Sequence, residues 1–170
     1  MERGVDALKR WTETSLTSIV YDSRVDPFTD DGLFERVRGK KNVAIVAFTM
    51  DGDVFGGFHS VAVMSQHSPN KDKKMFAFSL ESRGRCATPK RFPVKTVRNN
   101  ACVKFWRNDS DGWFVSFTVN SLGCFYLGNC SSRTWCRDLS FAFQGIEDTT
   151  LTGKNNEAFC CCRLVALTLS

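Results

Sequence analysis

The sequence predicts a mainly β, β-rich α+β domain: a two-sheet antiparallel β-sandwich with short peripheral helices. Two observations lead to this fold class. About nine apolar segments of strand length follow one another, separated by turn residues. Few segments repeat apolar residues at helical intervals, which disfavours a parallel sheet, because parallel strands need a crossover connection that is usually a helix.

Both expected helices lie near the start of the chain. Residues 6–13 repeat apolar positions at helical spacing, with Trp11 on the buried stripe, and we expect this helix to pack against the edge of the sandwich. Residues 19–21 are apolar and predict a brief strand. Thr29 then offers a capping hydroxyl for a second helix, which we expect to end near Arg38.

A hairpin is predicted next. Residues 43–48 form an almost continuous apolar run, typical of a strand covered on both faces. The pair Asp51-Gly52 follows, and it is typical of a tight hairpin turn. The return strand is expected over residues 54–63. Within it, Gly56-Gly57 indicates a close approach of another backbone or ring.

Alternating apolar and polar residues predict the later strands. They cover residues 75–80, 94–97, 101–106, 113–119, 123–127 and 158–169. Residues 131–143 give no clear pattern.

Side chains two residues apart in a strand share a face. One face of the strand over residues 113–119 is therefore expected to carry Trp113, Val115, Phe117 and Val119. In the closing strand, the same rule places Cys160, Cys162 and Leu164 on the face opposite to Cys161.

Composition is ordinary for a folded globular domain, with 42% hydrophobic and 24% charged residues. We find no linker or internal repeat, so we expect a helical lead-in over residues 1–10 and a single domain over residues 11–170. The first residues lack the apolar core of a secretory signal, and no stretch is long and apolar enough to span a bilayer. The expected location is the cytoplasm.

Eight cysteines occur in the chain, and in a cytoplasmic protein we expect them to be reduced thiols. No C-x-x-C pair is present, and His59 and His67 lack the spacing of paired metal ligands, so we expect neither a metal nor a cofactor. Cys86 is the candidate redox-sensitive thiol, because Arg83 and Arg85 make its surroundings electropositive. An ordinary loop cysteine is the alternative interpretation.

The residue pattern does not support catalytic chemistry. His59 and Ser60 are neighbours in an expected strand, close to Asp51 and Asp53 at the preceding turn. Consecutive strand residues point to opposite faces, so this serine and histidine are not expected to cooperate. We interpret His59 as a structural residue and predict no catalytic residue.

Basic residues give the chain a net charge of +5, and most are expected in solvated loops and helix ends. Four of them are candidates for a basic binding surface: Arg83, Arg85, Lys90 and Arg91. Over residues 83–107, basic residues are interleaved with Phe92, Phe105 and Trp106, a combination that can neutralise phosphates and stack bases. A basic nucleic-acid-binding regulator is therefore one alternative function.

Several segments resemble signatures of the TLDc domain family. They are Tyr21-Asp22-Ser23, Asp51-Gly52-Asp53, Val54-Phe55-Gly56-Gly57-Phe58 and Phe76-Ala77-Phe78-Ser79-Leu80. The resemblance implies a β-sandwich and a non-enzymatic interaction domain in oxidative-stress protection or proton-pump regulation. The implied protein partner is a subunit of the vacuolar proton-pumping ATPase, which would place the chain in the cytoplasm at the surface of an organelle. A cysteine-dependent, peroxide-reactive protein is a further alternative.

Overall fold

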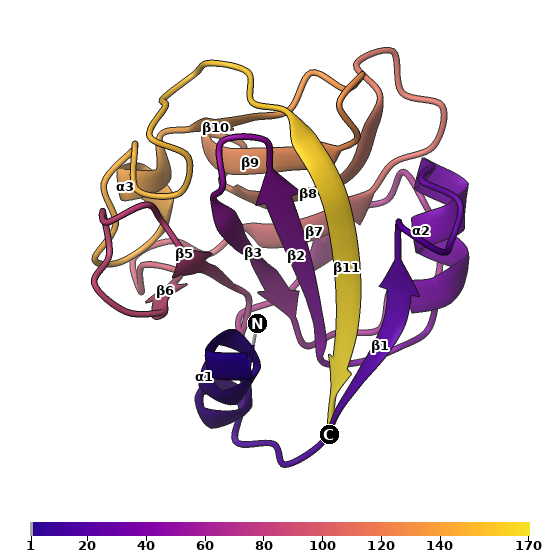
Figure 1. Ribbon diagram of the computed structural model, residues 1–170, viewed down its shortest axis with the longest axis horizontal. Helices are drawn as coiled ribbons and strands as arrows, with labels where there is room; N and C mark the ends of the chain where they lie inside the picture. Colours follow the sequence, from indigo (N-terminus) through magenta and orange to yellow (C-terminus); the bar gives the residue numbers. More distant parts are fainter. Residues whose placement is uncertain (1) are drawn as a thin grey trace.

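Two antiparallel sheets face each other in this protein (Figure 1). The computed structural model describes residues 2–170, so Met1, the first residue of the expected lead-in, lies outside the described residues. Over the described chain, three short helices lie at the periphery of the sheets. The predicted fold class, a two-sheet antiparallel β-sandwich with peripheral helices, is confirmed.

Sheet A has six strands and sheet B has five, counted over residues 2–170. In spatial order, sheet A consists of β1 (Thr17–Asp22), β11 (Cys161–Leu169), β2 (Val43–Thr49), β3 (Val54–His59), β5 (Phe76–Glu81) and β6 (Lys90–Pro93). Sheet B consists of β10 (Trp135–Arg137), β9 (Gly123–Gly128), β8 (Trp113–Val119), β7 (Ala101–Phe105) and β4 (Asn70–Lys71). The closing strand lies inside sheet A and pairs with both β1 and β2.

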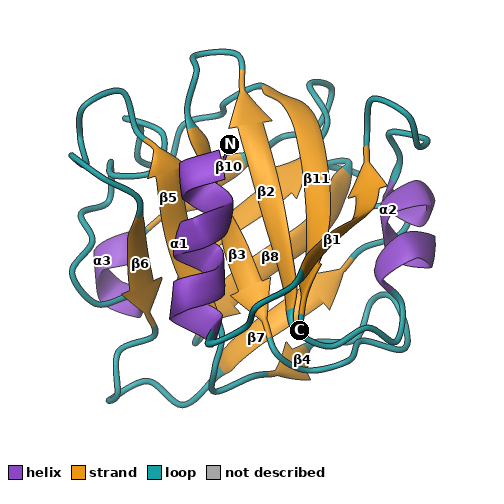
Figure 2. Cartoon of the chain, turned by 60° about the horizontal axis from the view of Figure 1, so that its bottom comes forward, coloured by secondary structure: helices purple, strands orange, loops and turns teal. Residues whose placement is uncertain are grey.

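The first helix, α1 (Glu2–Thr12), lies across the outer face of sheet A (Figure 2). Leu8 is fully buried among the outward-facing apolar side chains of this sheet, and Trp11 packs edge-on against the ring of Phe76. The expectation that this helix packs against the edge of the sandwich is therefore wrong. The outer face of sheet A is itself apolar, and burying it under a helix removes that surface from water.

The second helix, α2 (Asp30–Val37), begins where it was predicted. Thr29 is extended, and its Oγ1 accepts a hydrogen bond from the N–H of Gly32 at 3.0 Å, which confirms the predicted N-cap. Phe34 of this helix packs in the core between the sheets. The third helix, α3 (Leu139–Ala142), lies in the segment without a clear sequence pattern and also contributes to this inner core.

The predicted hairpin joins β2 to β3, and its turn contains Gly52 at a φ of +95°. A Cβ atom on Gly57 would lie 2.6 Å from the ring of Phe117, which belongs to the opposite sheet. A Cβ atom on Gly56 would lie 1.8 Å from the backbone oxygen of Ile45. The close approach predicted from the glycine pair is therefore confirmed.

A β-bulge near the start of β8 changes which side chains face the core. The register with β9 shifts between Trp113 and Val115, so that Phe114 and Val115 are both buried. Trp113 lies instead against Tyr126, which alternates with the core residues of β9. The expectation that Trp113 shares a face with the other odd-numbered residues of this strand is therefore wrong.

A second bulge lies at the start of β11, where the register with β2 shifts between Cys161 and Arg163. Cys161 is buried in the inner core together with Leu164, whereas Cys162 is exposed. The extra residue overturns the expected alternation, because Cys161 and Leu164 now face the same way. The strand also begins later than expected, since Ala158 bridges to Trp135 of sheet B.

Two other expected strands differ from the structure. Residues 94–97 do not form a strand: β6 lies earlier, because the fully buried Phe92 pairs with β5. The return strand of the hairpin ends at His59 and does not reach residue 63. The backbone N–H of Ser60 donates to the carboxylate of Asp72 and so leaves the strand ladder.

Candidate binding surface

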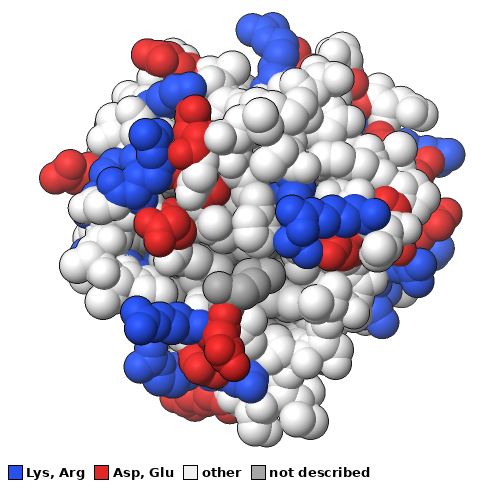
Figure 3. All heavy atoms as spheres, in the orientation of Figure 1, with Lys and Arg blue, Asp and Glu red and all other residues white. Residues whose placement is uncertain are grey.

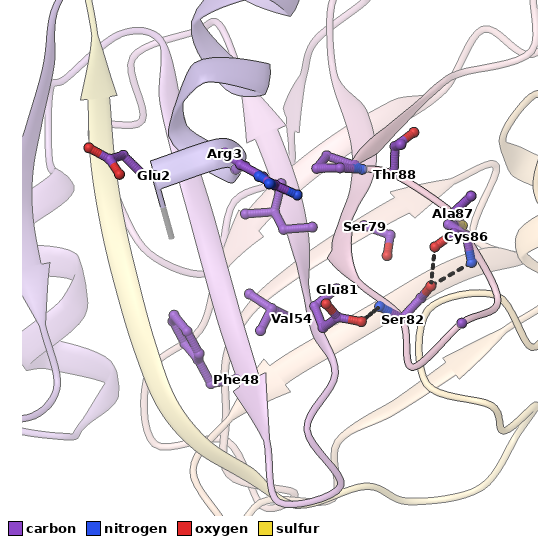
Figure 4. A pocket seen from close by; sticks show the side chains of 14 residues that line it. Glu2, Arg3, Phe48, Val54, Ser79, Glu81, Ser82, Cys86, Ala87 and Thr88 are labelled. Carbon is purple, nitrogen blue, oxygen red and sulfur yellow. Dashed lines mark hydrogen bonds between the residues drawn. The ribbon is translucent and has the colours of Figure 1, made fainter.

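A cavity of about 630 Å³ opens beside the start of α1 (Figure 4). Its walls come from α1, from β2, β3 and β5, and from the loop over residues 82–89. Ser79 lines it with only 1% of its surface exposed, and the Ser79 hydroxyl has no hydrogen-bond partner within residues 2–170. The charged lining residues are Glu2, Arg3 and Glu81, so the cavity does not favour an anionic ligand.

Cys86, the candidate redox-sensitive thiol, lies in the wall of this cavity and is half-buried. Its backbone N–H donates to the hydroxyl of Ser82 at 2.6 Å, which closes the loop on itself (Figure 4). The guanidinium of Arg85 pairs with the carboxylate of Asp53, so one of the two cations expected to activate the thiol is held by an acidic partner.

The four basic candidates divide into two kinds. Arg85 and Arg91 are tied to the fold: Arg85 pairs with Asp53, and Arg91 donates to the backbone oxygen of Trp11 at 2.8 Å. All four residues are exposed. On the face displayed in Figure 3, basic side chains are interspersed with acidic ones. Two of the four candidates, Arg85 and Arg91, are therefore also used in contacts within the fold.

His59, Ser60 and Asp53, the histidine, serine and aspartate that lie close together in the sequence, each bind a different partner. His59 is fully buried, its Nδ1 lies 2.8 Å from the backbone oxygen of Val61, and burial lowers its pKa. Its Nε2 has no hydrogen-bond partner within residues 2–170. Ser60 donates its hydroxyl to Asp72 at 2.7 Å, and Asp53 pairs with Arg85. These contacts are consistent with the interpretation of His59 as a structural residue.

The expectation that all eight cysteines are reduced thiols is wrong. Cys130 and Cys160 form a disulfide, with their Cα atoms 4.7 Å apart. Cys130 follows β9 and Cys160 precedes β11, so two residues that are distant in the sequence meet where the ends of the two sheets come together. Spacing along the chain could not reveal this pairing, because it depends on the sandwich.

The buried thiols are poorly suited to redox chemistry. Burial raises the pKa of Cys124 to about 11, the pKa of Cys161 to about 12, and the pKa of Cys136 still further. Thiols with such pKa values stay protonated and unreactive near neutral pH. Over the described chain, no three His, Cys, Asp or Glu side chains are grouped as a metal site would require.

Four aromatic side chains form a contiguous cluster on sheet B, which we call the aromatic face: Trp106, Trp113, Tyr126 and Trp135. All four are half-buried. The rings of Trp113 and Tyr126 have centroids 4.0 Å apart, and those of Tyr126 and Trp135 are stacked at 4.9 Å. Trp106 meets Trp113 edge-on at 5.2 Å. This cluster faces away from the inner core, whose rings come from other positions on the same strands.

Cations flank the aromatic face. The ammonium of Lys104 lies 3.6 Å from the ring centroid of Trp106, and the guanidinium of Arg137 lies 4.8 Å from that of Trp135. Beside these rings is a cleft of about 270 Å³. It is lined by Asp111, Trp113, Arg133, Trp135, Arg137, Asn156 and Ala158.

Sequence reasoning found only one member of the aromatic face, Trp106. Phe92 and Phe105, the other rings of the basic stretch, are fully buried in the core. Tyr126 and Trp135 were detectable in principle, since each alternates with a buried neighbour on its strand. Trp113 was not, because the bulge in β8 reverses the direction expected from its spacing.

The fold and these surfaces define a β-sandwich domain with a half-buried aromatic cluster flanked by cations. No protein-family model matches the chain, and a search of curated proteins likewise finds no match. Over residues 2–170, none of the helices is both long enough and apolar enough to cross a membrane.

Proposed function

We propose that this protein is a non-enzymatic, TLDc-like interaction domain that acts in oxidative-stress protection or in regulation of the vacuolar proton-pumping ATPase. The observation that carries the proposal is the set of hydrogen bonds and ion pairs made by the residues that resemble TLDc signatures. They are held by specific contacts, two of them with distant parts of the chain, as expected of a signature that encodes a fold.

Three contacts illustrate this set. Asp22 accepts two hydrogen bonds from Arg163 of the closing strand, at 3.0 and 2.5 Å. Asp53 pairs with Arg85 in the loop beside the cavity. Tyr21 donates its hydroxyl to the backbone oxygen of Pro27 at 3.0 Å, which holds the segment that leads into α2.

Binding, and not catalysis, is supported by the distribution of polar groups. The aspartates, serine and histidine that have catalytic potential are each bound to a different structural partner. Tryptophan, tyrosine and arginine side chains are, in contrast, the types that contribute most of the energy at protein interfaces. The aromatic face supplies such a set on one sheet.

A role in oxidative stress is supported by the disulfide between Cys130 and Cys160. In the proposed cytoplasmic location, a disulfide forms chiefly under oxidising conditions and is often redox-sensing. The bond joins the segment after β9 to the segment before β11, so it links the two sheets covalently.

Affinity capture from a cell lysate tests the proposal. The immobilised chain should retain subunits of the proton pump, and an unfolded, carboxymethylated sample of the same chain should not. Recovery of no pump subunit and no other stable protein partner would contradict the interaction function. Adding the purified chain to pump-containing membranes and measuring ATP hydrolysis would separate the regulatory role from simple association.

A further inference from the structure

The cleft beside the aromatic face has an unusual chemical composition. Two tryptophans, Trp113 and Trp135, form part of its lining together with two arginines, Arg133 and Arg137. Tryptophan and arginine are enriched among the residues that dominate protein–protein binding energy. Surface clefts that combine them in one place are therefore candidates for peptide recognition.

Both guanidinium groups have unused hydrogen-bonding capacity. Arg137 Nε is buried, yet it has no hydrogen-bond acceptor within residues 2–170, and its nearest carboxylate oxygen, on Asp138, is 3.6 Å away. Arg133 is 81% exposed at its side chain and reaches Asp111 through a single contact at 3.4 Å. A carboxylate can accept two parallel N–H bonds from a guanidinium, and neither arginine makes that arrangement here.

Among the residues that line the cleft, positive charge exceeds negative charge. Asp111 is the one acidic lining residue against two arginines. Lys104, which lies over Trp106, adds a further positive charge to the same face. Asp138 is the acidic side chain closest to Arg137, and at 3.6 Å its carboxylate leaves the Nε donor without a hydrogen bond.

The arrangement of the rings distinguishes a peptide from a nucleic acid. Tyr126 stacks on Trp135 and makes a tilted contact with Trp113, and cations lie over Trp106 and Trp135, so these ring faces are largely occupied. Binding of single-stranded nucleic acid depends on free ring faces for stacking with bases. Ring edges, which carry partial positive charge, suit carboxylates and the side chains of a peptide.

We propose that the cleft lined by Trp113, Arg133, Trp135 and Arg137 binds an acidic peptide segment, with a side-chain carboxylate held by the two arginines and an apolar side chain against the tryptophans. This proposal deepens the interaction function and rests on it: it assigns the surface and the chemistry of the partner. The partner segment contains Asp or Glu next to a large apolar residue.

Nuclear magnetic resonance titration of the isotopically labelled full chain tests this site. The probe is a capped octapeptide that alternates glutamate with phenylalanine, so that only its side chains supply carboxylates. The matched control alternates glutamine with phenylalanine. We expect the indole N–H signals of Trp113 and Trp135 to shift with the glutamate peptide while that of Trp11 stays in place, and we expect the glutamine peptide to bind about tenfold more weakly or worse.

Variants separate a specific site from general charge attraction. The double variant Arg133→Gln, Arg137→Gln should weaken the glutamate peptide about tenfold or more. Lys90→Gln, far from both arginines in the sequence and on the other sheet, is the control for a lost exposed cation, and it should leave the affinity unchanged. If the double variant is misfolded, as judged by the Trp11 signal, the comparison of the two peptides on the unmodified chain still decides.

Three results would overturn the proposal: no shift at the two tryptophans, equal binding of both peptides, or tighter binding of a 12-nucleotide oligothymidine at the same residues. Failure of the cleft proposal can be distinguished from failure of the interaction function. Capture of pump subunits by the unmodified chain and equally by the double variant would leave the function standing and remove the cleft. Peptide binding at the cleft without capture of any pump subunit would leave the cleft proposal standing and contradict the pump-related function.

Discussion

The carboxylate of Asp53 accepts a hydrogen bond from the guanidinium of Arg85, and this pair joins the β2–β3 hairpin to the loop over residues 82–89. Asp53 is only 1% exposed. The same guanidinium donates to the backbone oxygens of Thr150 and Leu151, so one arginine fixes three segments.

Replacing Asp53 with Asn should therefore be strongly destabilising. Removal of one partner of a buried ion pair leaves the other charge uncompensated, and we expect a loss of about 3 kcal/mol, because Arg85 is partly solvated. Urea unfolding of Asp53→Asn, Arg85→Gln and the double variant measures the coupling. A loss in the double variant equal to the sum of the two single losses would show that the two side chains do not depend on each other.

Gly57→Ala tests the close approach of the two sheets. The added methyl group would meet the ring of Phe117, and overpacking of this kind costs about 1–3 kcal/mol. Phe117→Leu makes room at the same place, so Gly57→Ala should cost less in that background. The free energies of unfolding of the two single variants and the double variant give the comparison, and an unchanged cost would place the clash elsewhere.

Reduction of the disulfide between Cys130 and Cys160 should lower stability by about 2–4 kcal/mol, because it releases a closed loop with a sequence separation of 30 residues. Denaturation midpoints with and without dithiothreitol measure the effect. The double variant Cys130→Ser, Cys160→Ser should unfold like the reduced chain and show no response to the reductant. A response that persists in this variant would have to come from another pair of thiols.

Acidification should weaken the pair of Asp22 and Arg163. Hydrogen bonds from Arg163 hold the pKa of the Asp22 carboxyl below its usual value of 3.8. A lowered folded-state pKa stabilises the fold above the unfolded pKa, and this contribution is lost as the pH falls below about 4. The difference in unfolding free energy between the unmodified chain and Asp22→Asn should therefore shrink between pH 5 and pH 2.5, and a constant difference would contradict this contribution.

His59 should make stability depend on pH over a higher range. Burial lowers its pKa below the ordinary value of 6.5, so the unfolded chain binds a proton that the folded chain does not. Stability is therefore expected to fall as the pH drops below about 6.5. His59→Asn should have a flatter profile between pH 7 and pH 5. Parallel profiles of the two proteins would mean that the imidazole titrates alike in the folded and unfolded states.

Local signals predicted the first half of the sandwich well. The cap at Thr29 and the turn at Asp51-Gly52 depend on neighbouring backbone atoms only, so their chemistry is visible over a few residues. The glycine pair in β3 was equally informative, since only a missing side chain explains two glycines in an apolar strand. The fold class followed from these elements and from the spacing of the strands.

Features that depend on distant contacts were not predictable in the same way. A bulge inserts one residue into a strand, and this reverses the facing of Trp113 and changes that of Cys161. The pairing of Cys130 with Cys160 and the docking of α1 on sheet A depend on the assembled sandwich. For the candidate site, the sequence pointed to Trp106 but not to the rings and arginines that surround it.

The position of β11 between β1 and β2 has a consequence for how the protein is made. On the ribosome, β2 emerges long before its partner, with eight other strands synthesised between them. At ordinary translation rates, the apolar edge of β2 waits on the order of ten seconds for β11. The β2–β3 hairpin covers only the opposite edge of β2, so the edge that β11 will occupy stays open to pairing with other chains during this time.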